Sequence, residues 1–576
     1  MGTPTDRRQR GGCRLLWLVL LLGACAVPPG APAPATPQAA AAPPAGASEL
    51  VITADRRASE AGLAMLRRGG APIDAAVAAQ AVLGLVEPQS SGLAGGSVLL
   101  VWSAASGQLT VVDGTPRTGH VAPRGLNVDA HGQPLDLASV VHGGGAVGVP
   151  GTLPALWREQ QKSGKLPWAD LFAPAITLAD AGFAMPRVLH DLLAMPDAPT
   201  TYGEAATPFL LPDGSVPPVG AVLRNPAYAA SLRRVAAQGP AGLYDGPALA
   251  ETMAALGRGA QPSRLTAQDL RGYAPGEPAP LCAPWRTWKI CTAPPPSFGG
   301  LVALQILQIA GDGDLSDAAF AHMFLDAGRL AEADRRHYVG DPDVVPVPTQ
   351  DLLDPHYLAA RAALIPQGQA LMHPKPGQPE PESAMRDDPG APTTATSQIV
   401  VVARTGDALS MTTSLTHTFG ARVAAGGVVF NNALANFAPA PPSGVHYMNE
   451  MEPGKRPATP FAPVVVLDAD GKPVLLGGSG GGPFAPDVVA AALIDILANH
   501  RTPTDALARP HLSSADPDHV AVEAGTTAEA LLPSLAAMGY QARADKIASG
   551  SAFALHGAGG WVGAADPRRD GAAAGD

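Results

Sequence analysis

The stretch that decides the fold lies at residues 393–413 and reads TTATSQIVVVARTGDALSMTT. Two runs rich in β-branched or hydroxylated residues, at 399–402 and 409–413, have the composition of strands. Between them Arg404-Thr405-Gly406-Asp407 has the residues of a hairpin turn. The sequence therefore predicts a β-hairpin here, and Thr396 stands where a polar loop ends and its first strand begins.

The surrounding sequence alternates between strand-like and helix-like patterns. Further strand-like runs lie at 428–430, 464–467 and 474–476, and Asp468-Ala469-Asp470-Gly471 supplies a second hairpin turn. Helix patterns occur at 60–68, 74–86, 152–162 and 487–498, while 366–395 is polar and rich in proline, as in an exposed loop. Short strands followed by a helix indicate an α+β fold, with helices covering sheets, rather than a βαβ array.

Composition excludes several classes of function. The chain has 576 residues, of which 46% are hydrophobic and 15% charged, so it can bury a large core. Its net charge of −11, without a basic stripe, argues against nucleic acid as the main partner. The run Gly143-Gly144-Gly145-Ala146-Val147-Gly148 formally fits a dinucleotide fingerprint, but Pro150-Gly151 follows at once, so a turn is expected. Neither a cofactor nor a metal site is predicted.

The N-terminus has the pattern of an export signal. Four arginines up to Arg14 precede the apolar run 15–22, which is short for a membrane span. Leu22-Gly23-Ala24-Cys25 resembles a bacterial lipobox, in which Cys25 is acylated; an ordinary signal peptide is the alternative. Residues 26–47 are mostly alanine and proline and form an expected tether. These features predict an exported protein, lipid-anchored at Cys25 on the periplasmic face of a membrane.

The two remaining cysteines are close in sequence. Cys282 and Cys291 stand in two short strand-like pieces separated by a turn. In an oxidising compartment they can form a cross-strand disulfide. Two free thiols on a hairpin are the other possibility.

An ordered set of motifs resembles the γ-glutamyltransferase (γ-glutamyltranspeptidase) family of N-terminal-nucleophile hydrolases. Residues 69–78 are similar to its GGNAxDAAVA segment, and residues 86–96 to its VxEPxxSGIGGG stretch. Further matches, in family order, are 145–151, 294–300, 333–335, 419–420, 431–432, 455–457, 478–482 and 566–571. Each is weak alone, but the set runs from about residue 48 to the C-terminus.

The resemblance implies a four-layer αββα fold and a precursor that cleaves itself before a catalytic threonine. Matching the hairpin glycine Gly406 places that residue at Thr396, with a large subunit at 48–395 and a small one at 396–576. Thr393, which begins a similar Thr-Thr-x-x-Ser pattern, is the alternative. The new α-amino group, with a pKa of ~7.7–8.0, can serve as the base for the threonine hydroxyl.

The resemblance also assigns the other site residues. Gly481 and Gly482 match the oxyanion hole, and Ser414 takes the place of a threonine that hydrogen-bonds the nucleophile. The positions that bind the glutamyl group in the family carry other residues here: Thr115 for an arginine, Ala433 and Asn436 for acidic or amide anchors, Thr416 for an asparagine, and Thr459-Pro460 for a serine pair. Arg117 is an alternative source of the missing positive charge.

Three functions remain open at this point. The resemblance implies acyl transfer from γ-glutamyl amides, such as glutathione, to water or an amine. A relative acting on another acyl amide, as the cephalosporin acylases of this superfamily do, is the second. A catalytically silent binding lipoprotein is the third. The expected partners are a small-molecule amide, the chain's own two subunits and, through the anchor, a membrane surface.

Overall fold

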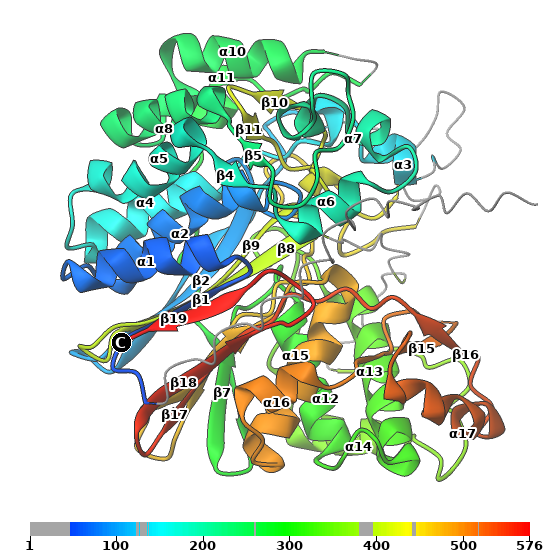
Figure 1. The fold of residues 1–576 in the computed structure, drawn as a ribbon. Helices are drawn as coiled ribbons and strands as arrows, with labels where there is room; N and C mark the ends of the chain where they lie inside the picture. The colour runs from blue at the N-terminus through cyan, green and yellow to red at the C-terminus, as the bar shows by residue number, and fades with distance from the viewer. Residues whose placement is uncertain are drawn as a thin grey trace, which may run out of the picture. The chain divides into compact units, whose positions relative to one another are not determined.

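Two six-stranded sheets organise the chain (Figure 1). The computed structural model describes residues 46–122, 126, 135, 137–258, 261–379, 387, 395–439, 445–516 and 518–576, all within the unit Ala42–Asp576. The expected export signal, most of the tether and Thr393 lie outside these residues. Their interpretation therefore remains a prediction.

The first sheet contains the hairpin that was predicted from residues 393–413. Its strand order is β19-β1-β8-β9-β2-β3, and its neighbours pair antiparallel. The bounds are β19 (Ala572–Gly575), β1 (Leu50–Thr53), β8 (Ala395–Val402), β9 (Ala408–Thr416), β2 (Gly96–Ser103) and β3 (Gln108–Gly114). Gly406 has φ +84° in the β8–β9 turn, a conformation that favours glycine.

The second sheet has the order β18-β17-β13-β12-β7-β6. Its strands are β18 (Gly560–Ala565), β17 (Ala552–Gly557), β13 (Pro473–Gly478), β12 (Val464–Leu467), β7 (Trp288–Thr292) and β6 (Leu281–Trp285). Cys282 and Cys291 lie opposite each other on β6 and β7 and form a disulfide, with their Cα atoms 4.1 Å apart. The possible cross-strand disulfide is thus confirmed.

Side chains of β8 contribute to two apolar clusters. Val400 and Val402 belong to the cluster between the sheets, together with Val465 of β12. Ile399 and Val401 belong to the cluster beneath the helices of the first sheet. Because both faces of β8 are covered, its sequence is a continuous apolar run rather than an alternating one.

Helices cover the outer face of each sheet (Figure 1). Those of the first layer include α1 (Arg56–Arg67), α2 (Pro72–Val86) and α4 (Thr152–Ser163). Those of the second include α12 (Gly299–Ala310), α13 (Ala318–Tyr338), α15 (Ala485–Leu493) and α16 (Pro503–Ala508). The four layers are helix, sheet, sheet and helix, which confirms the predicted αββα fold. The helix expected at 487–498 is α15 followed by a π-helical turn, Ile494–Ala498.

The remaining elements are short or peripheral. The helices are α3 (Leu137–Val140), α5 (Ala173–Ala181), α6 (Arg187–Leu193), α7 (Ala198–Ala206), α8 (Pro226–Gln238), α9 (Ala241–Tyr244), α10 (Gly246–Leu256), α11 (Ala267–Arg271), α14 (Pro355–Ala362) and α17 (Leu532–Ala537). The strands are β4 (Phe183–Ala184), β5 (Val222–Leu223), β10 (Ala424–Ala425), β11 (Val428–Val429), β14 (Leu512–Ser513), β15 (Val520–Glu523) and β16 (Ala542–Asp545).

The folded part begins slightly before the point that composition suggests. Ala47, which was assigned to the tether, is buried and pairs with Trp561. Ser48 N donates to the Asp576 carbonyl over 2.6 Å, so both ends of the described unit meet at the edge of the first sheet. Across the residues described, no helix combines the length and apolar character needed to span a membrane.

Candidate active site

Thr396 is the second residue of β8 and lies near the end of the first sheet. It pairs with Ser414 of β9, and a β-bulge between Ala395 and Thr396 places Ala395 opposite Thr416. By the alternation of a strand, Thr396 lies on the same face as Val400, which packs between the sheets. The threonine is 3% exposed. Its hydroxyl is therefore held inside the sandwich.

The Ser414 hydroxyl connects the two groups that a self-cleavage reaction requires. Thr396 Oγ1 donates to Ser414 Oγ over 3.2 Å. Ser414 Oγ in turn donates to the carbonyl oxygen of Ala395. It also accepts the amide of Thr416 over 2.7 Å. One side chain thus contacts both the candidate nucleophile and the carbonyl of the peptide bond before it.

The predicted oxyanion glycines lie next to Thr396. They follow β13, and Gly481 and Gly482 have φ values of +113° and +63°. A Cβ on Gly480 would stand 2.4 Å from the Thr396 carbonyl oxygen, and one on Gly481 would stand 2.1 Å from the carbonyl oxygen of Ala548. In the part of the chain that is described, the amides of Gly481 and Gly482 donate to no recorded acceptor. The glycines therefore permit close backbone approach and leave two donors available.

Backbone strain is concentrated just beyond β9. Thr416 has φ +85°, which is unfavourable for a β-branched residue. The loop is held by the buried side-chain amides of Asn431 and Asn432, a family-like motif to which the sequence assigned no role. Asn432 accepts the amide of His417 over 3.0 Å and donates to Gly420 O over 2.9 Å, and Asn431 donates to Ala94 O over 3.0 Å. These bonds stabilise the strained end of the strand beside Thr396.

Three positions expected to bind the acyl group carry uncharged side chains. They are Thr115, Ala433 and Asn436, and are called the neutral wall below. Gly96 of β2 pairs with Ser414, and Gly114 of β3 pairs with the next residue of β2, so Thr115 comes to the Thr396 end of the sheet. The 3₁₀ helix Ala433–Asn436 approaches the same end, because Asn432 N donates to Leu415 O over 3.2 Å. Among the described groups, neither Thr115 Oγ1 nor Asn436 Oδ1 has a hydrogen-bond partner, although both are buried.

Arg117, the alternative source of positive charge, contacts other groups of the protein. Its guanidinium lies over the ring of Tyr273, 4.7 Å from the centroid, and donates to Ala274 O over 2.7 Å. The nearby Arg456 is also occupied, since it pairs with Asp113 at 2.5 Å and with Asp341 at 2.5 Å. Arg456 is thus paired with carboxylates, whereas Arg117 keeps a buried Nε that has no hydrogen-bond partner among the described groups.

Thr459 lies against the second sheet. Its amide donates to Pro296 O over 2.9 Å, and its hydroxyl is 3.5 Å from Ser297 Oγ. The structure brings Thr396, Ser414, Thr416, the glycines, Thr115 and Asn436 to one end of the sandwich. Asn449 links the Thr459 segment to this end, because it accepts from Ala458 N over 2.9 Å and donates to Asn436 O over 2.8 Å.

A buried ion pair behind Thr396 was not predicted. Ser397 Oγ donates to Glu87 Oε2 over 2.5 Å, and Arg569 Nη1 donates to Glu87 Oε1 over 2.7 Å. Burial raises the pKa of Glu87, and the Arg569 charge opposes that rise. Both residues occur in family-like motifs. The available signal was a glutamate directly after the apolar helix α2.

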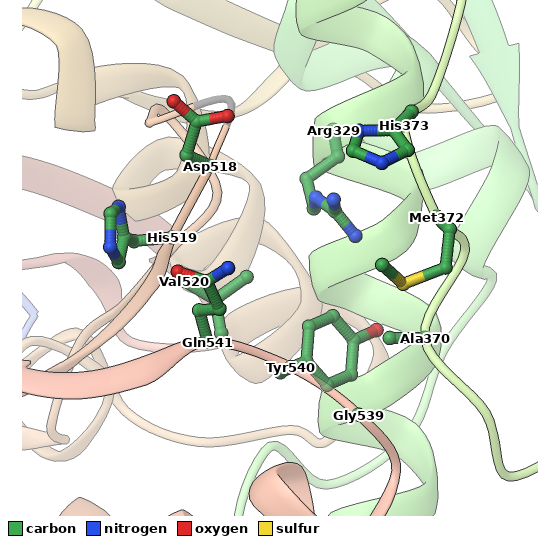
Figure 2. Close-up of a pocket in the computed structure, with 10 residues that line it drawn as sticks. All are labelled: Arg329, Ala370, Met372, His373, Asp518, His519, Val520, Gly539, Tyr540 and Gln541. Atoms are coloured by element: carbon green, nitrogen blue, oxygen red, sulfur yellow. The ribbon is translucent and has the colours of Figure 1, made fainter.

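The cavity drawn in Figure 2 is separate from this site. It has a volume of about 70 Å³ and lies between α13 and the β15–β16 region, with Arg329, His519 and Tyr540 in its lining. None of the Thr396-site residues lines it. It gives no support to an alternative reaction centre.

Comparison with known proteins identifies the family of the chain. The family model described as Gamma-glutamyltranspeptidase matches residues 58–576. The glutathione hydrolase proenzyme of Bacillus subtilis (strain 168) is 30% identical over 555 residues, which cover 92% of each chain. The acylase ACY 1 proenzyme of Pseudomonas sp. (strain SE83) is 29% identical over 547 residues, covering 92% of this chain and 94% of that one.

Solved structures agree with the fold. A cephalosporin acylase from Bacillus halodurans superposes with a TM-score of 0.81 over 96% of this chain and 99% of its own, at 24% identity, which supports the fold alone. The γ-glutamyltranspeptidase of Helicobacter pylori gives a TM-score of 0.54 at 27% identity, over 57% of this chain and 96% of that chain. Together with the αββα layers and the ordered motifs, these matches show that the chain belongs to the γ-glutamyltranspeptidase family of N-terminal-nucleophile enzymes.

Proposed function

We propose that the protein is a self-processing amide hydrolase and acyltransferase whose nucleophile is Thr396. The observation that carries this proposal is the Ser414 hydroxyl, which accepts from Thr396 Oγ1 and donates to the Ala395 carbonyl. A hydroxyl next to the carbonyl carbon, with a donor already on the carbonyl oxygen, is suited to attack on that carbon.

Processing would follow from this arrangement. Thr396 Oγ1 attacks the Ala395 carbonyl carbon, and the Ala395–Thr396 C–N bond breaks as the nitrogen takes up the proton that Oγ1 loses. The product is an ester between Ala395 and the Thr396 oxygen. Water then hydrolyses the ester, which leaves a carboxylate on Ala395 and a free α-amino group on Thr396. Ser414 supports the developing negative charge on the oxygen.

Turnover would use the same atoms again. The neutral α-amino group accepts the proton of the Thr396 hydroxyl as Oγ1 attacks the substrate amide. The amides of Gly481 and Gly482 donate to the tetrahedral oxyanion, and the leaving amine departs with a proton. Water or a second amine then takes the acyl group from Thr396. This scheme requires neither a histidine nor a metal ion.

The substrate class follows from the neutral wall. There are two candidate substrate classes. The name of the Bacillus subtilis relative suggests γ-glutamyl amides, and the name of the acylase relative suggests other acyl amides. A zwitterionic glutamyl head would meet Thr115, Ala433 and Asn436, while Arg117 is engaged with Tyr273 and Ala274. Loss of one partner of a buried charge pair costs about 2–5 kcal/mol. We therefore favour an acyl group without the charged α-amino acid head.

The segment that carries Asn436 adds no charge. Leu434, Ala435 and Phe437 pack with Val140 and Val141 in a buried apolar cluster. γ-Glutamyl turnover remains the alternative within the same chemistry.

The proposal is tested by the purified full chain on a denaturing gel. We expect two fragments, and N-terminal sequencing of the smaller one should give Thr-Ser-Gln-Ile. A start at Thr393 would assign the nucleophile to that residue instead. A single uncut band without amidase activity would favour the binding-lipoprotein alternative and overturn the proposal.

We also propose that the enzyme is exported and anchored through Cys25 on the periplasmic face of a membrane. The support is the basic and apolar N-terminal pattern, the lipobox-like sequence and the Ala/Pro tether. In the fold, Leu50 pairs with Val402, which is the far end of β8 from Thr396. The tether would thus join the end of the sandwich that is remote from the active site.

A further inference from the structure

The buried pair of Glu87 and Arg569 connects the two sides of the nucleophile strand. Glu87 directly follows α2 and is 4% exposed, and the side chain of Arg569 is 10% exposed. On the helix side of β8, Glu87 accepts a hydrogen bond from the hydroxyl of Ser397, the residue after the nucleophile. Arg569 also donates to Ser90 Oγ over 3.2 Å. Their carboxylate–guanidinium contact therefore lies directly behind Thr396.

The same arginine reaches the glycine loop on the other side of the strand. Arg569 Nε donates to Ser549 O over 2.7 Å, and Gly480 N donates to Gly550 O over 3.2 Å. A Cβ on Gly550 would stand 2.6 Å from Arg569 Nε, and one on Gly480 would stand 3.2 Å from Arg569 Nη2. The guanidinium consequently packs on bare backbone at the loop that carries the oxyanion donors.

We propose that Glu87 and Arg569 are a positioning pair that holds β8 and the glycine loop together at Thr396 and cancels net charge beside its α-amino group. The inference rests on the proposed N-terminal nucleophile. Neither residue touches the substrate in this scheme. Their effect passes through Ser397 on one side and through the 549–550 backbone on the other.

The other ionisable groups at this end of the sheet are paired or lie on neighbouring elements. Asp55 follows β1 and is paired with Arg57 at 2.5 Å, and His417 follows β9. Asp566, which accepts from Ser549 Oγ, is paired with Arg568 at 3.3 Å, and Arg568 is paired with Glu523 at 2.5 Å. Glu87 follows α2, and Arg569 follows β18. The charge of Asp55 is balanced by Arg57. The Glu87–Arg569 pair has no net charge while both of its members are ionised. Removal of Glu87 leaves a buried positive charge close to the amine, whereas removal of Arg569 leaves a carboxyl that burial drives toward its neutral form.

The experiment compares kcat/KM as a function of pH in the processed full-length enzyme, with a simple acyl anilide that the wild type hydrolyses. The acidic limb reports the apparent pKa of the α-amino group. In Arg569→Met the buried Glu87 carboxyl, whose pKa burial raises, loses the opposing Arg569 charge and takes up a proton, so the limb should stay near its wild-type position. Glu87→Gln leaves a positive charge and should move it down by about one unit.

Two further variants separate charge from geometry. The double variant Glu87→Gln with Arg569→Met should return the limb to near its wild-type position, while kcat stays about tenfold lower because the loop is no longer bridged. Arg569→Lys keeps the charge but loses the Nε bond to Ser549 O. It should keep the limb in place and lower kcat.

Arg361→Met is the matched control, because it removes a buried arginine that pairs with Asp334 at 2.9 Å in the outer helical layer. It should lower Tm without moving the limb. If Arg569→Met remains uncut while Arg569→Lys is cut, positioning is supported and the Glu87→Gln shift decides the charge argument. A limb that does not move down in Glu87→Gln would overturn the inference while processing and turnover of the wild type stand. An uncut and inactive wild type would instead overturn the proposed function.

Discussion

The hydroxyl groups of Thr396 and Ser414 face each other across the β8–β9 pair, 3.2 Å apart, and the Ser414 hydroxyl donates to the Ala395 carbonyl. The β-bulge between Ala395 and Thr396 is what turns that carbonyl toward Ser414. The relationship makes the processing reaction accessible to direct tests.

Replacement of the nucleophile should abolish processing. Thr396→Ala removes Oγ1, so we expect only the full-length chain on a denaturing gel. Thr396→Ser retains a hydroxyl and should be cut more slowly. Thr393→Ala is the matched control and should be cut like the wild type. Cleavage in Thr396→Ala, or its loss in Thr393→Ala, would place the nucleophile elsewhere.

Removal of the Ser414 hydroxyl should slow both reactions of Thr396. Loss of one preorganised donor to an oxyanion costs about 10²–10³ in rate, so we expect a comparable fall in the processing rate of Ser414→Ala, followed in time on gels. Ser414→Thr restores the hydroxyl and should recover most of the rate. Ser410→Ala serves as the control, because Ser410 Oγ donates to Gly477 O on the same strand, away from Ala395. Equal rates in Ser414→Ala and Ser410→Ala would contradict this role.

The neutral wall predicts the specificity. We expect weak hydrolysis of γ-glutamyl anilides, with the loss mainly in kcat/KM because ground state and transition state share the missing contacts. Simple acyl anilides should be hydrolysed more efficiently. Thr115→Arg combined with Asn436→Asp should raise γ-glutamyl turnover. Family-typical efficiency of the wild type on the γ-glutamyl substrate would show that other residues hold the head group.

Buried His511 predicts a loss of stability in acid. Burial lowers the pKa of His511 from 6.5 to about 4, and the nearby Arg568 charge adds to this effect. Between pH 6.5 and 4, His511 is protonated in the unfolded chain but mostly neutral in the folded chain. The free energy of unfolding should therefore fall by up to about 3 kcal/mol as the pH falls from 6.5 to 4. His511→Gln should remove this contribution, as measured by denaturant unfolding at several pH values.

The difference in the free energy of unfolding between wild type and His511→Gln separates the effect of His511 from that of Asp487, which changes with pH in the opposite direction. Burial raises the pKa of Asp487 to about 6, so the folded chain keeps that proton and stability falls as the pH rises toward 6. This contribution is present in both proteins. His446→Gln, with a side chain that is 71% exposed, should match the wild type. A pH-independent difference between wild type and His511→Gln would refute the assignment.

The proposed anchor gives a prediction for the intact precursor in a bacterial host. A fatty-acid probe should label the wild type and Cys13→Ala, but not Cys25→Ala, because only Cys25 follows the lipobox-like residues. The lipid should also keep the protein in the membrane fraction. Label on Cys25→Ala would rule out acylation at that residue.

Local sequence patterns were sufficient to predict the hairpin, α2 and the disulfide strands. The run at 399–402 and the turn glycine Gly406 carry their own structural preference, so β8 and β9 were expected where they occur. The contact between Thr396 and Ser414 was expected from the family resemblance, not from the local pattern. The register shift between Ala395 and Thr396, which leaves Leu415 of β9 without a partner in the ladder, was not predictable, because it depends on how the two strands pair in three dimensions.

Residues that act through distant contacts were not predicted. Ser397 meets Glu87 across 310 positions, and Arg569 meets it across 482. No periodicity or spacing in one sequence encodes such a pair. The left-handed conformation of Thr416 is likewise imposed by the packing around Asn431 and Asn432, since a threonine has no intrinsic preference for it.

The order of strands in the first sheet has a consequence for the cleaved protein. β8 and β9, after the predicted cut, lie between β1 and β2, which precede it, and β19 pairs on the other side of β1. A single chain assembles this sheet by a first-order reaction, but two separated fragments would have to find each other in solution. The stability of the mature enzyme would therefore depend on protein concentration, and dilution of denatured enzyme would suppress its recovery. Processing would convert a reversible folding equilibrium into a structure that, once opened, is rarely rebuilt.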